Sequence, residues 1–266
     1  IKLDPVSERQ CKMTFTQRID GAGLLPAFVV DSKIASSLEL VEEVRENFER
    51  DKEIDLLEST ALCNMMERVG EVRVASEEPP LLVGRDETYS PPELGSIERI
   101  RNLAANVKMT EIDSPSHHVT MASGVIEGDS NMAAFGEVVL DASIEECACR
   151  DYLASRRANN EFYNKAGGIL RNIYSYNSHC HIRRSIFDPG APGFDHRQFL
   201  WKVIWQKIDD DTMVVVYDSI ITNFDPVWNF PATPKDVVIA KSWTLVTFKK
   251  LPAFNGIPQT KISYTS

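Results

Sequence analysis

The sequence predicts an α+β fold in which an antiparallel sheet forms the body of the protein and helices lie to one side. Two observations lead to this class. Short runs of alternating polar and apolar residues recur after residue 119, each closed by Pro, Gly, Asn or Asp. Helical spacing of apolar residues is confined to a few segments, two of which begin at a capping box. Successive strands with short connections pair antiparallel.

The strands follow one another closely along the second half of the chain. The alternating runs that we interpret as strands cover residues 119–122, 134–140, 170–187, 197–208, 212–222 and 236–250. An earlier alternating run, 12–20, ends at Gly21 and is also predicted to be a strand.

Three helices are predicted around these strands. Ser36 and Glu39 form a capping box before a helix that extends to about Lys52. Ser143 and Glu146 form a second capping box. A short amphipathic helix is indicated between them by Ile97, Ile100, Arg101, Ala104 and Val107.

Composition excludes several classes of protein. The chain has 266 residues, 43% of them hydrophobic and 26% charged, which is typical of a folded globular protein. With 39 acidic against 29 basic residues its net charge is −10, and no basic stripe with interleaved aromatics follows the chain, so we expect no nucleic acid partner. Apolar runs such as 213–217 have the length of a strand and not of a membrane span. An odd count of five cysteines favours a reducing, cytoplasmic location.

The two ends of the chain resemble each other. Residues 1–17 match residues 249–266, with Lys12-Met13-Thr14-Phe15-Thr16 aligned to Lys261-Ile262-Ser263-Tyr264-Thr265. We interpret this as a fragment of a tandem array, cut at both ends. The expected organisation is the C-terminal strand and helix of one unit in residues 1–60, a linker in 61–96, and most of the next unit, without its C-terminal helix, in 97–266. The helix of the first part could fold back onto the second unit, or residues 1–60 could pack elsewhere.

When residues 97–266 are read first and residues 1–60 are placed after them, as in one complete unit, the order of strands and helices resembles that of the START (steroidogenic acute regulatory protein-related lipid transfer) family. The resemblance rests on three segments: Glu137–Glu146, which leads from a strand into a helix; His196–Phe199, which opens a strand; and Ile19–Val30. It implies a helix-grip fold, that is, a curved antiparallel sheet wrapped around a long C-terminal α-helix. Gln198 stands where the family usually has an acid, and 155–157 lacks the expected Trp-Asp, so the chain looks like a divergent branch.

The resemblance also implies a function, which is binding of a lipid or another apolar small molecule in an internal cavity, for transfer or sensing. The ligand would be a lipid or sterol, and transient contact with a membrane surface is possible for such a protein. Because side chains alternate along a strand, Phe199, Trp201, Val203 and Trp205 share one face and could line this cavity. Filling a solid core is the alternative role for the two tryptophans.

The predicted ligand-binding set also includes residues of the helix in the first part of the chain, which are Leu38, Val41 and Phe48. These apolar positions recur at helical spacing, and the resemblance would let this helix cover the cavity. Simple packing within a domain is the alternative.

We expect no catalytic residues, no metal and no cofactor. A zinc site could be assembled from His179, His181, Cys147, Cys149 and the pair at 117–118, but the spacings are not those of usual zinc sites.

Two other functions stay open. A cavity enzyme of the same superfamily would need inward acid and base groups, for which the candidates are Asp141, His181, Arg183 and Glu137. A regulatory or scaffold module in a tandem protein would need neither transfer nor chemistry.

Overall fold

The computed structural model describes residues 2–7, 10–14, 50–68, 88–126, 132–153, 163–220 and 226–266. It divides the chain into two compact units, Ile1–Asp51 and Lys52–Ser266. Leu38, Val41 and Phe48, together with the capping box predicted at residue 36, lie outside the described residues.

The described part of the first unit is a two-stranded antiparallel hairpin of β1 (Lys2–Ser7) and β2 (Gln10–Thr14). The matching segment 249–266 also lies in a hairpin, but the two registers differ. Leu3 pairs with Met13, whereas Ile262, the counterpart of Met13, pairs with Phe248. The tandem arrangement therefore stays a prediction.

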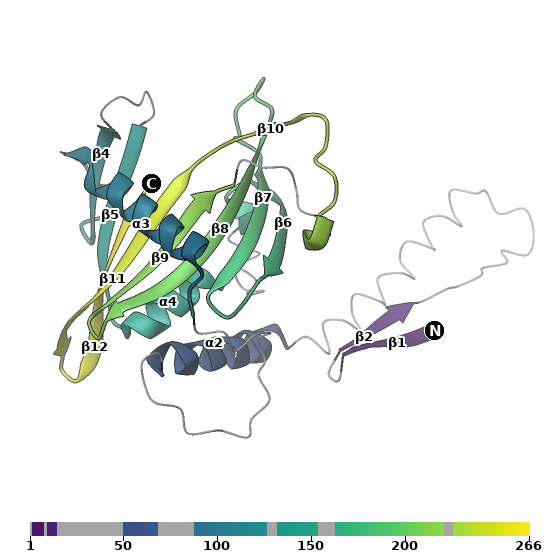
Figure 1. The fold of residues 1–266 in the computed structure, drawn as a ribbon, viewed down its shortest axis with the longest axis horizontal. Coiled ribbons are helices and arrows are strands. Elements are labelled where there is room, and N and C mark those ends of the chain that lie inside the picture. Colours follow the sequence, from purple (N-terminus) through teal and green to yellow (C-terminus); the bar gives the residue numbers. More distant parts are fainter. Residues whose placement is uncertain are drawn as a thin grey trace, which may run out of the picture. The chain divides into compact units, whose positions relative to one another are not determined.

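The second unit is built on one large sheet (Figure 1), which confirms the predicted antiparallel architecture. Its neighbouring strands follow the order β3-β4-β5-β12-β11-β9-β8-β7-β6, all antiparallel, and short β10 pairs parallel with β8. The strands are β3 (Val107–Ile112), β4 (Val119–Ile126), β5 (Met132–Leu140), β6 (Gly168–Ser175), β7 (Cys180–Phe187), β8 (His196–Asp209), β9 (Thr212–Ser219), β10 (Val237–Ile239), β11 (Trp243–Phe254) and β12 (Ile257–Thr265).

Two of the predicted strand runs are in fact pairs of strands. The run 170–187 turns back after Ser175 and forms the β6–β7 hairpin, and the run 236–250 contains β10 and the first part of β11. The last hairpin of the sheet turns at Asn255 and Gly256, whose φ angles are 51° and 81°. Positive φ at both central residues is what a two-residue type I′ turn requires, and Asn-Gly is a favoured pair for it.

Helices cover both faces of the sheet, which differs from the prediction that they lie to one side. α3 (Pro91–Ala105) crosses one face, while α4 (Ile144–Tyr152) lies behind the sheet in the view of Figure 1. α2 (Asp51–Glu67) packs with α4 through Leu62 and Met66. None of these three helices is long and apolar enough to span a membrane.

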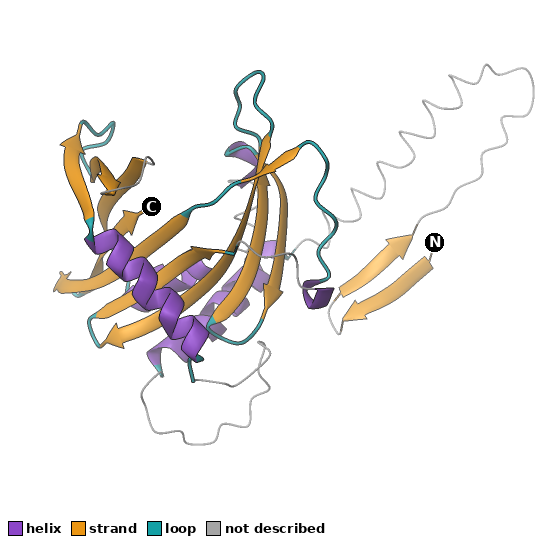
Figure 2. Cartoon of the chain, turned by 45° about the horizontal axis from the view of Figure 1, so that its top comes forward, coloured by secondary structure: helices purple, strands orange, loops and turns teal. Residues whose placement is uncertain are grey.

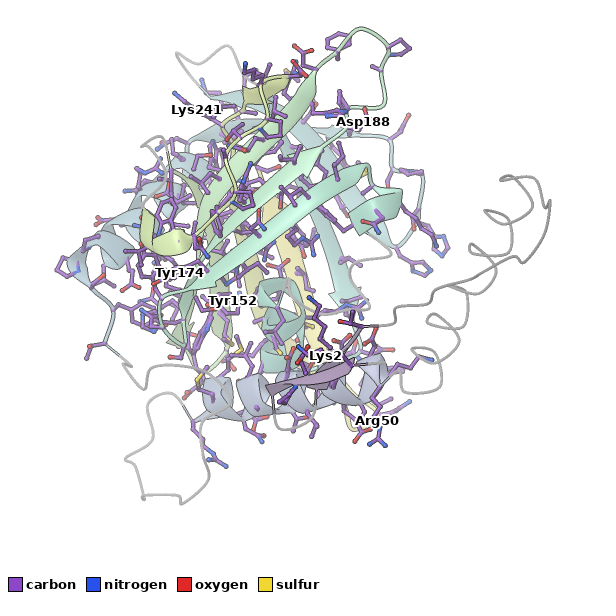
Figure 3. All side chains as sticks on the ribbon, turned by 90° about the vertical axis from the view of Figure 1, so that its right-hand side faces the viewer. Lys2, Arg50, Tyr152, Tyr174, Asp188 and Lys241 are labelled. Carbon is purple, nitrogen blue, oxygen red and sulfur yellow. The ribbon has the colours of Figure 1, made fainter. Side chains whose placement is uncertain are left out.

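Strand β8 shows how the two faces are separated. Val203 and Trp205 belong to the core that α4 and α2 cover, and Ile204 belongs to the core beneath α3. We call the two sides the α4 face and the α3 face. Two residues labelled in Figure 3 mark them: Tyr152 packs on the α4 face, and Tyr174 lies on the α3 face. Helices on both sides are shown as purple ribbons in Figure 2.

The expected linker 61–96 is partly helical. α2 continues through Glu67, and α3 already begins at Pro91. Ser90 caps α3 in a capping box with Glu93, and proline follows at the first helical position, where its missing N–H has no cost.

The beginning of α3 is held to the sheet by buried polar contacts. The Tyr89 hydroxyl donates to the carbonyl of Trp205 at 2.8 Å, and its ring lies 4.1 Å from that of His179. The amide of Asn177 donates to the buried carboxylate of Glu93 at 2.9 Å, and His179 Nε2 lies 3.4 Å from the same oxygen. These contacts join α3 to the β6–β7 turn.

The Glu93 carboxylate should make the stability of the protein sensitive to acid. Burial alone would raise its pKa, but hydrogen bonds from Ser90 and Asn177 outweigh this effect and lower the pKa to about 2. Because the ordinary value is about 4.3, the carboxylate stabilises the fold above that pH, and this contribution is lost as the pH falls toward 2. We expect Glu93→Gln to show a flatter fall in the free energy of unfolding over this range, measured by urea titration. Glu98→Gln, on the exposed side of α3, should show the wild-type dependence of the free energy of unfolding on pH. The same dependence in wild type and both variants would contradict a lowered pKa of Glu93.

Candidate ligand-binding site

A continuous row of aromatic rings crosses three strands on the α4 face. Phe187 of β7, Phe199 and Trp201 of β8, and Tyr217 of β9 form it, with successive ring centroids 6.1, 5.1 and 6.2 Å apart. Phe199 and Trp201 are stacked with only 5° between their planes, and the outer contacts are edge-to-face. The rings meet because residues two apart on a strand, and diagonal neighbours on adjacent strands, share a face. We call these four residues the aromatic row.

The helices cover only part of the face on which the four predicted β8 residues lie. Val203 and Trp205 are 0% and 2% exposed and pack beneath α4 and α2. Phe199 and Trp201 are only half-buried. Packing in a solid core therefore describes the inner two residues, while the outer two keep apolar surface accessible.

Hydrogen bonds fix the rings of Trp201 and Tyr217, which form one end of the row. The indole Nε1–H of Trp201 donates to Ser242 Oγ at 2.9 Å. The hydroxyl of Tyr217 donates to Asp151 Oδ2 at 2.9 Å, so α4 orients this ring through its penultimate residue. Rings held in this way form a preorganised surface, and little side-chain entropy is lost when a ligand covers them.

A polar cluster adjoins the row at Tyr217. Asp151 also accepts from Tyr264 at 2.9 Å, and the guanidinium of Arg183 lies 5.1 Å from the Tyr217 ring centre. Arg183 Nη2 donates to the carbonyl of Tyr152 at 3.3 Å. Its Nε–H is buried and has no hydrogen-bond partner in the part of the chain that the structure describes. A buried donor without an acceptor is costly, so this N–H can accommodate a further oxygen.

Burial dominates the electrostatics of the cluster. It raises the pKa of Asp151, against the lowering effects of Tyr264, Arg183 and Tyr217. It lowers the pKa of His181 well below its ordinary value, and the positive charge of Arg183 adds to this shift. His181 is consequently a neutral imidazole at physiological pH, with its ring 4.5 Å from that of Tyr152.

The candidates for acid–base chemistry are only partly brought together. His181 and Arg183 lie on the α4 face, with a ring nitrogen and Nη2 3.4 Å apart. Glu137 instead pairs with Lys261 at 3.2 Å, and Asp141 accepts from Gln259 at 2.7 Å, both near β12. The carboxylate that adjoins Arg183 is Asp151, which the sequence does not single out.

The residues of the possible zinc site do not converge. His179 contacts Tyr89 at the start of α3, whereas His181 contacts Tyr152 at the end of α4. The described residues contain no group of three or more metal-ligating side chains that could hold an ion. The rings of the pair at 117–118 contact each other at 3.7 Å.

Sequence reasoning missed Phe187, Tyr217 and Asp151. Tyr217 could have been found, because it continues the alternation of Met213 and Val215 on the face that packs beneath α4. Asp151 follows no periodic signal, because its role depends on where the end of α4 meets the sheet.

No family model matches the sequence, and no curated protein matches it. Among solved structures the chain is similar to a STAR-related lipid transfer protein fragment from Xanthomonas axonopodis, at 11% identity and a TM-score of 0.41, over 60% of this chain and 80% of that one. It is similar to human StAR-related lipid transfer protein 5, at 14% identity and a TM-score of 0.46, over 65% and 76% of the two chains. It is also similar to norcoclaurine synthase from Thalictrum flavum, at 11% identity and a TM-score of 0.30, over 71% and 80%. The first two bear the name of the family that the sequence resembles.

Asp151 should lower the stability of the protein as the pH rises. Its folded-state pKa is raised, so the protonated form is favoured in the native protein, and its stabilising contribution is lost as the pH increases through that pKa. Asparagine keeps an acceptor for one tyrosine and cannot ionise. We therefore expect the stability of Asp151→Asn relative to wild type to improve between about pH 4 and pH 7, measured as the free energy of urea unfolding. Asp113→Asn, an exposed change, is the control; a constant difference between Asp151→Asn and wild type would refute the expectation.

Proposed function

We propose that the second unit binds a lipid or another apolar small molecule against the aromatic row, for transfer or sensing. The observation that carries this proposal is the half-buried state of Phe199 and Trp201 on a face that α4 and α2 otherwise cover. Folding normally buries stacked aromatic rings on the inner face of a sheet. A row left accessible beside a packed core is a surface that an apolar ligand can complete.

The rings can contribute useful binding energy. A large aromatic side chain buries on the order of 150–250 Å² in total. If a ligand covers the roughly one third of that area that folding leaves exposed on each of two rings, the gain at roughly 25 cal/mol per Å² is about 1.5 kcal/mol for each ring. Contacts with the remaining rings of the row would add to this.

The polar cluster supports a ligand with an oxygen at one end. Arg183 offers a buried N–H that lacks a partner among the described residues, and the carboxylate of Asp151 lies near its positive charge. Because this N–H is buried and needs an oxygen acceptor, an uncharged hydroxyl or carbonyl fits best, since it supplies the acceptor without bringing a further charge into the cluster. A sterol or an ester-linked acyl chain has this combination of an apolar body and a small polar end.

Exchange of such a ligand would involve transient contact with a membrane surface. Phe254 and Ile257 flank the β11–β12 turn and are 68% and 48% exposed, and Lys249 and Lys250 lie further along β11. Exposed apolar side chains next to lysines are suited to shallow contact with lipid headgroups. Cys63, Cys147, Cys149 and Cys180 form no disulfide with one another, as expected for the cytoplasmic location that we propose.

The aromatic row can be tested with Phe199→Ala and Trp201→Ala. Native mass spectrometry of the full chain, after exposure to a lipid extract, should show one retained lipid per chain. Affinity for the identified lipid, measured by displacement of a fluorescent analogue, should fall about tenfold for each variant, since roughly 1.5 kcal/mol is lost with each ring.

The matched controls are Phe194→Ala and Trp243→Ala. Phe194 is 62% exposed outside the sheet, and Trp243 packs on the α3 face. Both controls should keep wild-type affinity. Repeated absence of retained lipid, or equal losses in controls and test variants, would favour a scaffold role or a cavity enzyme instead.

A further inference from the structure

A second concave site lies on the opposite side of the sheet from the aromatic row. It is a groove of about 720 Å³ between the beginning of α3, the strands β7–β9 and the short helix η1 (Pro226–Trp228). This volume is in the range of sites for small molecules. Ile182 and Lys202 line it, and both point away from the aromatic row, because Lys202 alternates along β8 with Trp201 and Val203.

One end of the groove is apolar and firmly held. Ile182 and Trp228 are 1% and 8% exposed and belong to one packed cluster, to which Ile220 contributes. The indole Nε1–H of Trp228 donates to the hydroxyl of Tyr176 at 2.8 Å. This wall does not need to rearrange to receive an apolar group.

The loop after η1 is fixed to the same face. The fully buried guanidinium of Arg184 donates from Nε to Gln198 at 2.8 Å and from Nη1 to the carbonyl of Pro231. Thr233 donates to the same side-chain oxygen of Gln198 at 3.0 Å. The groove is therefore bounded on both sides by segments anchored to the sheet, α3 on one and the η1 loop on the other.

The other end of the groove carries two carboxylates that have partners and one ammonium that has no ion pair among the described residues. The carboxylate of Asp218 is ion-paired with Arg99 of α3, and the carboxylate of Glu93 accepts from Ser90 and Asn177. The ammonium of Lys202 makes no ion pair among the residues that the structure describes, and it donates to Ser96 Oγ at 3.5 Å. Both acids are engaged, whereas a lysine has three N–H donors to offer.

We propose that this groove binds a small amphipathic carboxylate, with its apolar body on Ile182, Ile220 and Trp228 and its carboxylate on Lys202. The ion pair between Asp218 and Arg99 reduces the repulsion that a free aspartate, directly opposite Lys202 in the strand register, would exert on the ligand. A neutral ligand would leave the ammonium without its best partner. This site is independent of the aromatic row.

The test uses 4-phenylbutyrate, with 4-phenylbutan-1-ol as the uncharged probe of the same shape. In the full ¹⁵N-labelled chain, the indole N–H signal of Trp228 is assigned with Trp228→Phe and followed by NMR during titration. We expect phenylbutyrate to shift this signal saturably and the alcohol to bind at least about tenfold more weakly. Lys202→Gln should weaken phenylbutyrate binding by a similar factor, and Phe199→Ala should leave it unchanged.

A second variant separates loss of the site from loss of folding. Ile220→Trp fills the floor of the groove and keeps the ammonium, so it should also weaken binding, while thermal unfolding monitors the fold of each variant. The proposal is overturned if phenylbutyrate leaves the Trp228 signal unshifted, or if folded Lys202→Gln and Ile220→Trp bind it as tightly as wild type. The signal of Trp201 reports on the aromatic row in the same spectra, so failure at one face is distinguishable from failure at the other.

Discussion

The alternation of side chains along β8 is the constraint on which both faces of the second unit depend. Successive residues of a strand point to opposite sides, so this single strand supplies Trp201 and Trp205 to the α4 face and Lys202 and Ile204 to the α3 face. A slip of one residue in its pairing with β7 or β9 would place lysine in the core and tryptophan in the groove. The helices on the two sides oppose such a slip, because each requires a different set of residues beneath it.

The helical side of the core was only partly predictable from the sequence. The capping box at Ser143 marks the beginning of α4 correctly, and Ile97 and Ile100 do lie on the buried side of α3. A capping box is also present at Ser90 and Glu93, but the two prolines between them led to the prediction of a linker in this region. Nothing local indicates that α3 and α4 occupy opposite faces, because that choice is made by contacts between residues far apart in the sequence. Tyr89 and Trp205, for example, are 116 positions apart.

The candidate site was also only partly predictable from the sequence. Alternation was sufficient to place Phe199, Trp201, Val203 and Trp205 on one face, yet it could not say where the covering helices end. That boundary decides which residues are core and which remain accessible. The polar cluster was beyond prediction for a related reason, since Asp151 meets Tyr217 and Tyr264 through three separate elements. The groove on the α3 face likewise requires the η1 loop, whose attachment through Arg184 has no pattern in the sequence.

Among the described residues of the second unit the sheet is open, because β3 and β6 each pair with a described strand on one side only. An edge of this kind presents unpaired backbone groups and can template pairing with another chain. At β3, the exposed side chains include Lys108 and Glu111, and charges on an edge oppose stacking against a second sheet. At β6, Ile169 is 52% exposed. The guanidinium of Arg171, on the same strand, lies 3.8 Å from the centre of the Tyr163 ring. Ile112 of β3 is also exposed, at 42%, so each border of the sheet combines a charged side chain with an exposed apolar one. Self-association through either border would set these charges against those of a second chain, which limits it even when the chain is concentrated.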